Sequence, residues 1–463
     1  MLGAFDIGDL GYVAEEFFVS GAASSYAPAT ELGPDGRWDV TPSGATEYTT
    51  RIVVLTPADG AQCPDFNGTA LVEWLNVSGG IDAPAVWMMA HREILRAGYA
   101  YVAVSAQRVG VEGGVSLLGA DMSLKTQHPV RYAPLRHPGD QFSYDIFSQI
   151  GELVRHAGDN GSRGVLGDLR AQHVIAVGES QSAMFLTTYV NAVDPIARSY
   201  DGFLVHSRFA SAAPLDGSSI FAESQAASPE AVAFRADLRV PLVAVITETD
   251  LFGGPRHGYY FARQPDNERL RVWEIPGAAH ADNYTIQVAP IDSGSAPLDA
   301  IVAAYAPTDL LMGQQLEHYI NFAPQHHYVV QAALAVLNTW VRTGEPAPAG
   351  PPIGVHESDQ ARPVLDSNGL AQGGVRTPWV DVPIARTSVI GDDESVMATI
   401  FGSGEPFDAA TLRRLYPGGV EQYLDGFTAA LDRAIGSGFI LPADRTEILQ
   451  LAAATYPRGD PAA

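Results

Sequence analysis

The sequence has a single cysteine, no long apolar run and few basic residues. Cys63 stands alone among 463 residues, so an intramolecular disulfide, a C-x-x-C redox pair and a cysteine-rich zinc site are all excluded. No segment approaches the roughly 18 consecutive apolar residues that a membrane helix needs, so we expect no membrane partner. The 53 acidic and 28 basic residues give a formal net charge of -25, which repels nucleic-acid phosphates. We therefore expect no nucleic-acid partner.

The first residues lack the basic segment and apolar stretch that mark a secretory leader. This absence favours a cytoplasmic protein, although a sequence trimmed at its start would look the same. No His-x-x-x-His or similar spacing supports a metal site, and we expect none.

Short β-rich apolar runs alternate with longer helical patterns along most of the chain, as in layered α/β proteins. Several runs are continuously apolar, which is typical of parallel strands that helices cover on both faces. The predicted strands are 50–56, 69–76, 100–105, 173–177, 202–206, 240–247 and 270–275. The predicted helices are 140–155, with Asp140 as its cap, 181–193 and 331–342.

Two changes of pattern predict the organisation of the chain. Residues 283–323 hold Pro290, Gly294 and Pro297 and then a predicted helix around 310–319, and we interpret them as a lid. A proline-rich segment at 344–352 marks a junction. We therefore expect a catalytic domain over 1–343 and a C-terminal extension over 344–463 that packs on it.

The segment Gly178-Glu179-Ser180-Gln181-Ser182 lies between a buried-strand pattern and a helix pattern. A serine on so sharp a turn has a strained backbone, and the residues two before and two after it must be small. Gly178 and Ser182 meet this condition, although glycine is commoner at the second position. Ser116 and Ser219 also follow a glycine by two residues, but neither comes after a buried strand. Ser180 is the predicted nucleophile.

A serine nucleophile needs a histidine base that a carboxylate orients. The strand 270–275 ends in Pro276-Gly277-Ala278-Ala279-His280, and the strand 240–247 ends in Glu248-Thr249-Asp250. This is the chain order Ser, acid, His of α/β-hydrolases. We predict His280 as the base and favour Asp250 as the acid. Glu248, two residues away, remains the alternative, and Asp282 is a weaker one.

Ester cleavage also needs two N–H donors for the developing oxyanion. The backbone of Gln181, directly after the nucleophile, supplies the first. The loop Asn76-Val77-Ser78-Gly79-Gly80 follows an early strand, so we expect the second donor to be Val77 or Ser78.

On these motifs the chain resembles the large α/β-hydrolase-domain proteins of bacteria and fungi, a branch of the serine esterase superfamily. The resemblance rests on the following segments: Glu15-Glu16-Phe17-Phe18-Val19-Ser20-Gly21, Val72-Glu73-Trp74-Leu75-Asn76-Val77-Ser78, His137-Pro138-Gly139-Asp140, the Ser180 motif, Thr247-Glu248-Thr249-Asp250, Trp273-Glu274-Ile275-Pro276-Gly277-Ala278-Ala279-His280, Leu415-Tyr416-Pro417 and Gly438-Phe439-Ile440-Leu441. It implies an α/β-hydrolase fold with a mostly parallel central sheet. It also implies that the C-terminal extension is part of the family's own architecture.

These features predict a serine hydrolase that cleaves a small-molecule carboxylic ester or lactone without a cofactor. The same acyl-enzyme would serve an acyltransferase, which differs only in whether water is excluded. A catalytically silent hydrolase fold that binds a small apolar ligand is a third hypothesis, because fold and function are separable. An aspartate-nucleophile mechanism is disfavoured, since serine stands at the turn.

Overall fold

The computed structural model describes residues 2–58, 65–117, 119–158, 163–220, 229–254, 257–311, 313–356, 359–388 and 396–457. The chain forms two compact units. Unit 1 comprises Met1–Ala244, Phe261–Leu270 and Leu337–Ala347, and unit 2 comprises Val245–Tyr260, Arg271–Val336 and Pro348–Ala463. The division predicted after residue 343 stays a prediction.

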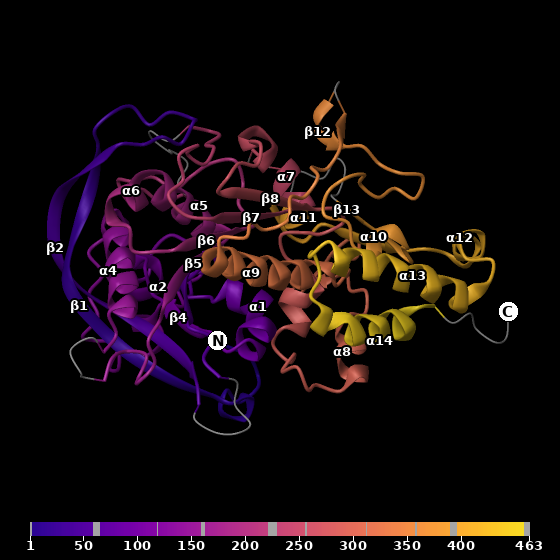
Figure 1. The fold of residues 1–463 in the computed structure, drawn as a ribbon, viewed down its shortest axis with the longest axis horizontal. Coiled ribbons are helices and arrows are strands. Elements are labelled where there is room, and N and C mark those ends of the chain that lie inside the picture. The colour runs from indigo at the N-terminus through magenta and orange to yellow at the C-terminus, as the bar shows by residue number, and fades with distance from the viewer. Residues whose placement is uncertain are drawn as a thin grey trace. The chain divides into compact units, whose positions relative to one another are not determined.

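An eight-stranded sheet has the strand order β1-β2-β4-β3-β5-β6-β7-β8. Its two long strands, β1 and β2, lie side by side (Figure 1). Its strands are β1 (Tyr12–Pro28), β2 (Val40–Pro57), β3 (Thr69–Trp74), β4 (Ala100–Val104), β5 (His173–Glu179), β6 (Gly202–His206), β7 (Leu242–Thr247) and β8 (Leu270–Ile275). Strand β3 pairs in parallel with β4 and β5, and β5 pairs in parallel with β6. Every residue of β3, β4, β6 and β7 is buried, as their apolar sequences predicted. The predicted α/β fold with a mostly parallel sheet is confirmed.

The long antiparallel pair β1 and β2 was only partly predicted. It runs in register from Tyr12 opposite Pro57 to Pro28 opposite Val40, with one irregularity between Ser24 and Tyr26. Most residues of β1 are exposed or half-buried, so its sequence lacks the apolar run that predicted the inner strands. Helix α4 (Ser143–Arg155) packs on β1, where Asp145 accepts the backbone N–H of Ser24 at 2.7 Å.

Among the other helical segments of unit 1, η1 precedes β1 and the rest follow strands of the sheet. They are η1 (Gly8–Leu10), α1 (Ala85–Arg96), α2 (Arg108–Glu112), α3 (Leu124–Gln127), η2 (Asp140–Phe142), α5 (Gln181–Thr188), η3 (Tyr189–Val193) and α6 (Asp194–Ala197). The predicted cap of helix 140–155 is wrong. Asp140 lies in the separate turn η2, and its carboxylate accepts the N–H of Arg108 at 2.7 Å, so α4 begins only at Ser143. The predicted helix 181–193 is α5, continued by the π-helical turn η3.

Aromatic side chains fill the core of unit 1 between β3, α4 and α5. Trp74 is fully buried, and its ring centroid lies 4.8 Å from that of Phe147 and 5.3 Å from that of Phe185. Phe147 in turn lies 5.0 Å from Tyr200. Contacts of this kind bury large apolar areas and favour offset or tilted rings. The core therefore fixes α5, the helix that follows Ser180.

Unit 2 contains the end of β7, most of the chain that follows it, and the C-terminal extension from Pro348 onward. Its elements include α7 (Glu248–Phe252), η5 (Tyr284–Val288), α8 (Leu298–Ala304), β9 (Leu310–Leu311), β10 (Gln314–Gln315), β11 (Val355–His356), β12 (Asp359–Pro363), α10 (Pro378–Asp381), β13 (Ala385–Ser388), α11 (Val396–Phe401), β14 (Ser403–Pro406), α12 (Ala409–Leu415), α13 (Gly419–Gly436), η6 (Pro442–Asp444) and α14 (Arg445–Thr455). The segments η4 (Tyr259–Ala262) and α9 (Gln325–Thr343) have residues in both units.

The helix predicted around 310–319 is wrong. Strands β9 and β10 pair there as a short hairpin, with Leu311 opposite Gln314. Gly313 has φ +83°, a left-handed conformation that glycine adopts at no steric cost and that turns the chain back. Helix α9 begins at Gln325, six residues before its predicted start. The lid function of 283–323 stays a prediction.

The C-terminal extension packs on strand β8 and on the loop that follows it. Pro348 accepts the indole N–H of Trp273 at 2.8 Å, and the backbone N–H of Ile353 donates to Glu274 at 2.7 Å. Trp379 of the extension stacks on Tyr328 of α9, and within the extension it meets Phe427 of α13 edge-on. Among the described residues, no helix is both long enough and apolar enough to cross a membrane.

Candidate active site

Ser180 lies in unit 1 on the sharp turn between β5 and α5. Its backbone has φ 55° and ψ -117°, a strained combination for a residue with a side chain. The turn is held at both ends, because the N–H of Ser180 donates to the carbonyl of His206 at 2.9 Å and its own carbonyl accepts from Met184 at 3.1 Å. The serine itself is partly exposed. This is the strand-to-helix geometry that the motif predicted.

The small residues around Ser180 have the steric role that the sequence indicated. A Cβ on Gly178 would lie 3.2 Å from the carbonyl oxygen of Ser182, so the two positions face each other closely. Ser182 also adds hydrogen bonds that glycine could not make. Its hydroxyl accepts the N–H of Glu179 at 3.0 Å and donates to the carbonyl of Glu179 at 2.8 Å. Serine at this position therefore braces the turn.

The loop after β3 is tied to the same turn by Asn76. Its side-chain amide donates to the backbone carbonyl of Glu179 at 3.2 Å and to the Glu179 carboxylate at 3.1 Å. Its side-chain oxygen accepts the N–H of Ser78 at 2.8 Å. The sequence predicts that this loop lies near Ser180, but it does not predict the role of Asn76, whose amide makes both hydrogen bonds to Glu179.

Gln181 makes the second connection between the turn and this loop. Its Oε1 accepts the backbone N–H of Val77 at 3.2 Å, and its Nε2 donates to Oε1 of Gln107 at 2.8 Å. Gln107 is held in turn by the indole N–H of Trp74 at 3.1 Å. The backbone N–H of Gln181 belongs to the first turn of α5, where helices provide no internal partner. Two predicted oxyanion donors, Gln181 and Val77, are thus connected through one side chain.

A cavity of about 340 Å³ in unit 1 is lined by Gln181 and Val77. Phe185 and Ile220 form part of its apolar lining, and Gln107 and Asp140 form part of its polar lining. A cavity of this size, mostly apolar with a few polar groups, is typical of small-molecule sites. The residue that follows Ser180 therefore lines this cavity.

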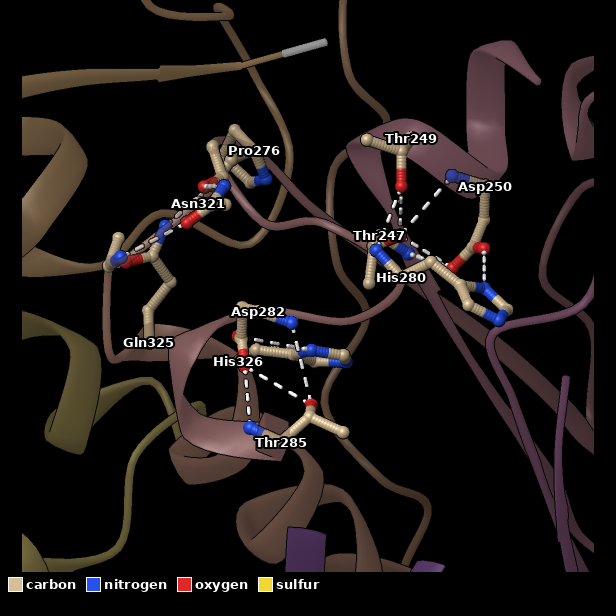
Figure 2. A network of polar contacts seen from close by, with 12 residues as sticks. Thr247, Thr249, Asp250, Pro276, His280, Asp282, Thr285, Asn321, Gln325 and His326 are labelled. Carbon is tan, nitrogen blue, oxygen red and sulfur yellow. Dashed lines mark hydrogen bonds and ion pairs between the residues drawn. The ribbon is translucent and has the colours of Figure 1, made fainter. Parts of the chain in front are cut away.

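His280 and Asp250 form a buried pair in unit 2 (Figure 2). Nδ1 of His280 lies 2.5 Å from Oδ1 of Asp250. Asp250 is fully buried and sits in the first turn of α7, where its other oxygen accepts from the hydroxyl of Thr247 at 2.5 Å and from the Thr247 N–H at 3.1 Å. The hydroxyl of Thr247 accepts the N–H of Asp250 in return, which completes a capping box.

The surroundings of Asp250 keep it charged. Burial by itself raises the pKa of Asp250, but the nearby His280 and the hydrogen bonds from His280 and Thr247 hold it below its ordinary value. An ionised carboxylate accepts the Nδ1 proton of the imidazole, so Nε2 is left as the basic nitrogen.

The loop that carries His280 is clamped by side chains from several elements. Glu248, the alternative acid, accepts the backbone N–H of Gly277 at 2.7 Å, and Thr249 accepts that of His280 at 2.8 Å. On the other side of the loop, Asn321 donates to the carbonyl of Gly277 at 2.9 Å. The extension contributes as well, because the N–H of Ala281 donates to the carbonyl of Ile400 at 2.8 Å.

The weaker candidate acid, Asp282, has a different neighbourhood. Its Oδ1 accepts the N–H of Thr285 at 3.0 Å, and its Oδ2 lies 3.6 Å from Nδ1 of His326 (Figure 2). His326 and Asp282 are both buried. Asp282 thus hydrogen-bonds within its own segment and lies beside His326.

A family model described as "Alpha/beta hydrolase domain" matches residues 1–450. The chain belongs to this family. The resemblance inferred from the motifs is thereby confirmed, and the match includes most of the C-terminal extension. No curated protein matches the chain.

Several solved structures of this fold are similar to the chain at low identity. A fungal esterase from Rhizomucor miehei is 11% identical with a TM-score of 0.32, over 72% of this chain and 85% of that one. A ferulic acid esterase from Streptomyces cinnamoneus is 12% identical with a TM-score of 0.32, over 72% and 92%. An alpha-beta serine hydrolase homologue from Coxiella burnetii is 11% identical with a TM-score of 0.28, over 50% and 84%.

Proposed function

We propose that this α/β-hydrolase cleaves small carboxylic esters or lactones through an acyl-enzyme on Ser180. The observation that carries the proposal is the backbone of Ser180, a residue with a side chain at φ 55° between a buried strand and a helix. Strain of this kind costs free energy and is typical of functional sites, where it exposes the nucleophile. The cavity that Gln181 lines supports a small-molecule substrate.

The proposed chemistry assigns one role to each residue. Nε2 of His280 takes the proton of the Ser180 hydroxyl as Oγ bonds to the substrate carbonyl carbon. The imidazolium then gives this proton to the leaving alcohol as the C–O bond breaks, and water releases the acyl group by the same steps. Asp250 fixes the imidazole through Nδ1 and stabilises its charged form. In a lactone the leaving alcohol stays attached to the acyl group.

The proposed oxyanion donors are the backbone N–H groups of Gln181 and Val77. Preorganised donors of this kind stabilise the charge that develops on the carbonyl oxygen. Ser78, the other candidate, has its N–H committed to the side chain of the preceding Asn76 at 2.8 Å. The N–H of Val77 donates instead to the side chain of Gln181, the residue of the other proposed donor, and this bond is longer, at 3.2 Å, so we prefer Val77 as the second donor.

A fluorophosphonate probe tests the proposal directly. Wild-type protein should be labelled at Ser180 and should hydrolyse 4-nitrophenyl butyrate, and Ser180→Ala should lose both properties. Ser116→Ala is the matched control, because Ser116 also follows a glycine by two residues and its hydroxyl donates to the carbonyl of Ala120. It should keep both. Wild-type protein without labelling, or labelling that persists in Ser180→Ala, would refute the proposal.

A further inference from the structure

The N–H of Val77 is already engaged in the free protein. Val77 is 1% exposed, and Oε1 of Gln181 lies 3.2 Å from its nitrogen. A buried N–H without a partner destabilises a fold, so an oxyanion donor that waits for substrate needs an interim acceptor. The carboxamide oxygen of Gln181 is such an acceptor, and it belongs to the residue that supplies the other proposed donor.

We propose that the side chain of Gln181 is an exchangeable placeholder for the substrate's carbonyl oxygen. In the free enzyme its Oε1 holds the N–H of Val77, and substrate replaces it there. This inference rests on the proposed function, because it takes Val77 as an oxyanion donor. It adds a role for the Gln181 side chain, whereas the oxyanion hole itself uses only its backbone.

The exchange is favourable in the transition state and nearly neutral in the ground state. Hydrogen bonds to a charged acceptor are roughly twice as strong as those between neutral groups, so an oxyanion outcompetes a carboxamide oxygen for the same N–H. The neutral carbonyl of a bound ester has no such advantage. The placeholder therefore favours the tetrahedral oxyanion over the ester.

The structure also shows what holds Gln181 after the exchange. Its Nε2 donates to Gln107 at 2.8 Å, and Gln107 is fixed by Trp74. Both glutamines line the cavity, so an arriving ligand contacts the side chain that must move. A rotation of the Gln181 amide about this anchor would free Val77 without disturbing α5.

The test uses Gln181→Met, which keeps the length of the side chain and removes the acceptor. If the Gln181 side chain is a placeholder, its loss should raise the affinity for an oxyanion mimic. If it is a purely structural contact, its loss should lower that affinity. With the N–H of Val77 left without its acceptor, the protein should melt at a lower temperature. A boronic acid, which adds Ser180 Oγ to boron and gives a tetrahedral anion, should nevertheless bind about fivefold more tightly because it displaces nothing. The inhibition constant is measured against 4-nitrophenyl butyrate.

Gln149→Met is the matched control. Gln149 donates to the carbonyl of Ala22 at 2.8 Å and accepts from the hydroxyl of Tyr48, and none of these residues lines the cavity. This variant should melt lower and bind the boronic acid as the wild type does. Should Gln181→Met not fold, Gln181→Ala admits water to Val77 and should also bind the boronic acid more tightly.

Weaker or unchanged boronic acid binding in both Gln181 variants would overturn the placeholder. That result leaves the proposed function intact as long as the wild type is labelled at Ser180 and hydrolyses the ester. A wild type that is neither labelled at Ser180 nor able to hydrolyse the ester would refute the proposed function itself. The two failures are therefore distinguishable in one set of experiments.

Discussion

Two fully buried carboxylates, one in each unit, have opposite pKa shifts. Glu73 lies on β3 in unit 1, and Asp250 begins α7 in unit 2; both are 0% exposed. Burial raises the pKa of Glu73 to about 8, although hydrogen bonds from Tyr101 and from the backbone of Val86 and Trp87 oppose the rise. The pKa of Asp250 is held below its ordinary value.

The difference comes from the partners and not from burial. Glu73 accepts from three neutral donors, the N–H groups of Val86 and Trp87 and the hydroxyl of Tyr101 at 2.6 Å. Asp250 faces an imidazole, and a group that can carry positive charge favours the ionised carboxylate far more than neutral donors do. The imidazole partner and the lowered pKa together make Asp250 a candidate for catalysis. Glu73 instead fastens the start of α1 to the sheet.

The largest expected effect is the loss of catalysis when Asp250 can no longer orient the imidazole. Asp250→Asn keeps the shape of the side chain but presents an amide in place of the carboxylate, which permits the wrong tautomer of His280. We expect kcat for 4-nitrophenyl butyrate to fall about 10⁴-fold with the protein still folded. Circular dichroism and steady-state kinetics check the two parts of this prediction. A fall in kcat of less than tenfold would show that Asp250 is not the acid of the proposed triad.

The next effect is on stability and concerns Glu73. Its folded pKa of about 8 lies above its ordinary value of 4.5, so between these values the native state holds a proton that the unfolded state has released. The free energy of unfolding therefore falls as pH rises through this window, by about 5 kcal/mol in all. The pH dependence is opposite for Asp250. Its ionised form stabilises the fold above its ordinary pKa, and this stabilisation is lost as pH falls from there through its lowered pKa.

Glu73→Gln isolates this contribution, because glutamine does not titrate. Urea denaturation at several pH values between 5 and 8.5 should give a smaller decline for the variant than for the wild type. At pH 5 the variant should be less stable than the wild type, because glutamine keeps only part of the hydrogen bonding of Glu73 with Val86, Trp87 and Tyr101. Parallel declines in the two proteins would show that Glu73 does not titrate in this window.

The features that could be predicted from the sequence are those that depend on local sterics or on continuous burial. The Ser180 turn needs small residues at 178 and 182, and this requirement is visible within five residues. The inner strands were visible as apolar runs. The outer strand β1 was not, because most of its residues are half-buried or exposed. The sequence predicts a helix at 310–319, but the structure has the hairpin of β9 and β10 there. The difference rests on Gly313, whose left-handed backbone lies at the turn between the two strands.

The choice between Glu248 and Asp250 could not be made from the sequence for a different reason. If the strand continued past Thr247, residues two apart would point the same way. The chain instead enters α7 at Glu248, and residues two apart on a helix are about 200° apart around its axis. Asp250 therefore contacts the imidazole of His280, whereas Glu248 contacts the backbone of the loop. Only the capping box of Thr247 and Asp250 hinted at this early helix start.

The smallest expected effect concerns Glu248, and it sharpens the distinction between the two carboxylates. Its carboxylate accepts the N–H of Gly277, three residues before His280, so we expect it to position the loop rather than to touch the reacting groups. Glu248→Gln can still accept this N–H and should lower kcat by less than about tenfold, with no change in how kcat depends on pH. Kinetics across pH 5 to 9 checks both parts. A loss as large as that of Asp250→Asn would instead make the two carboxylates one functional unit, and the acid of the proposed triad would have to be reassigned.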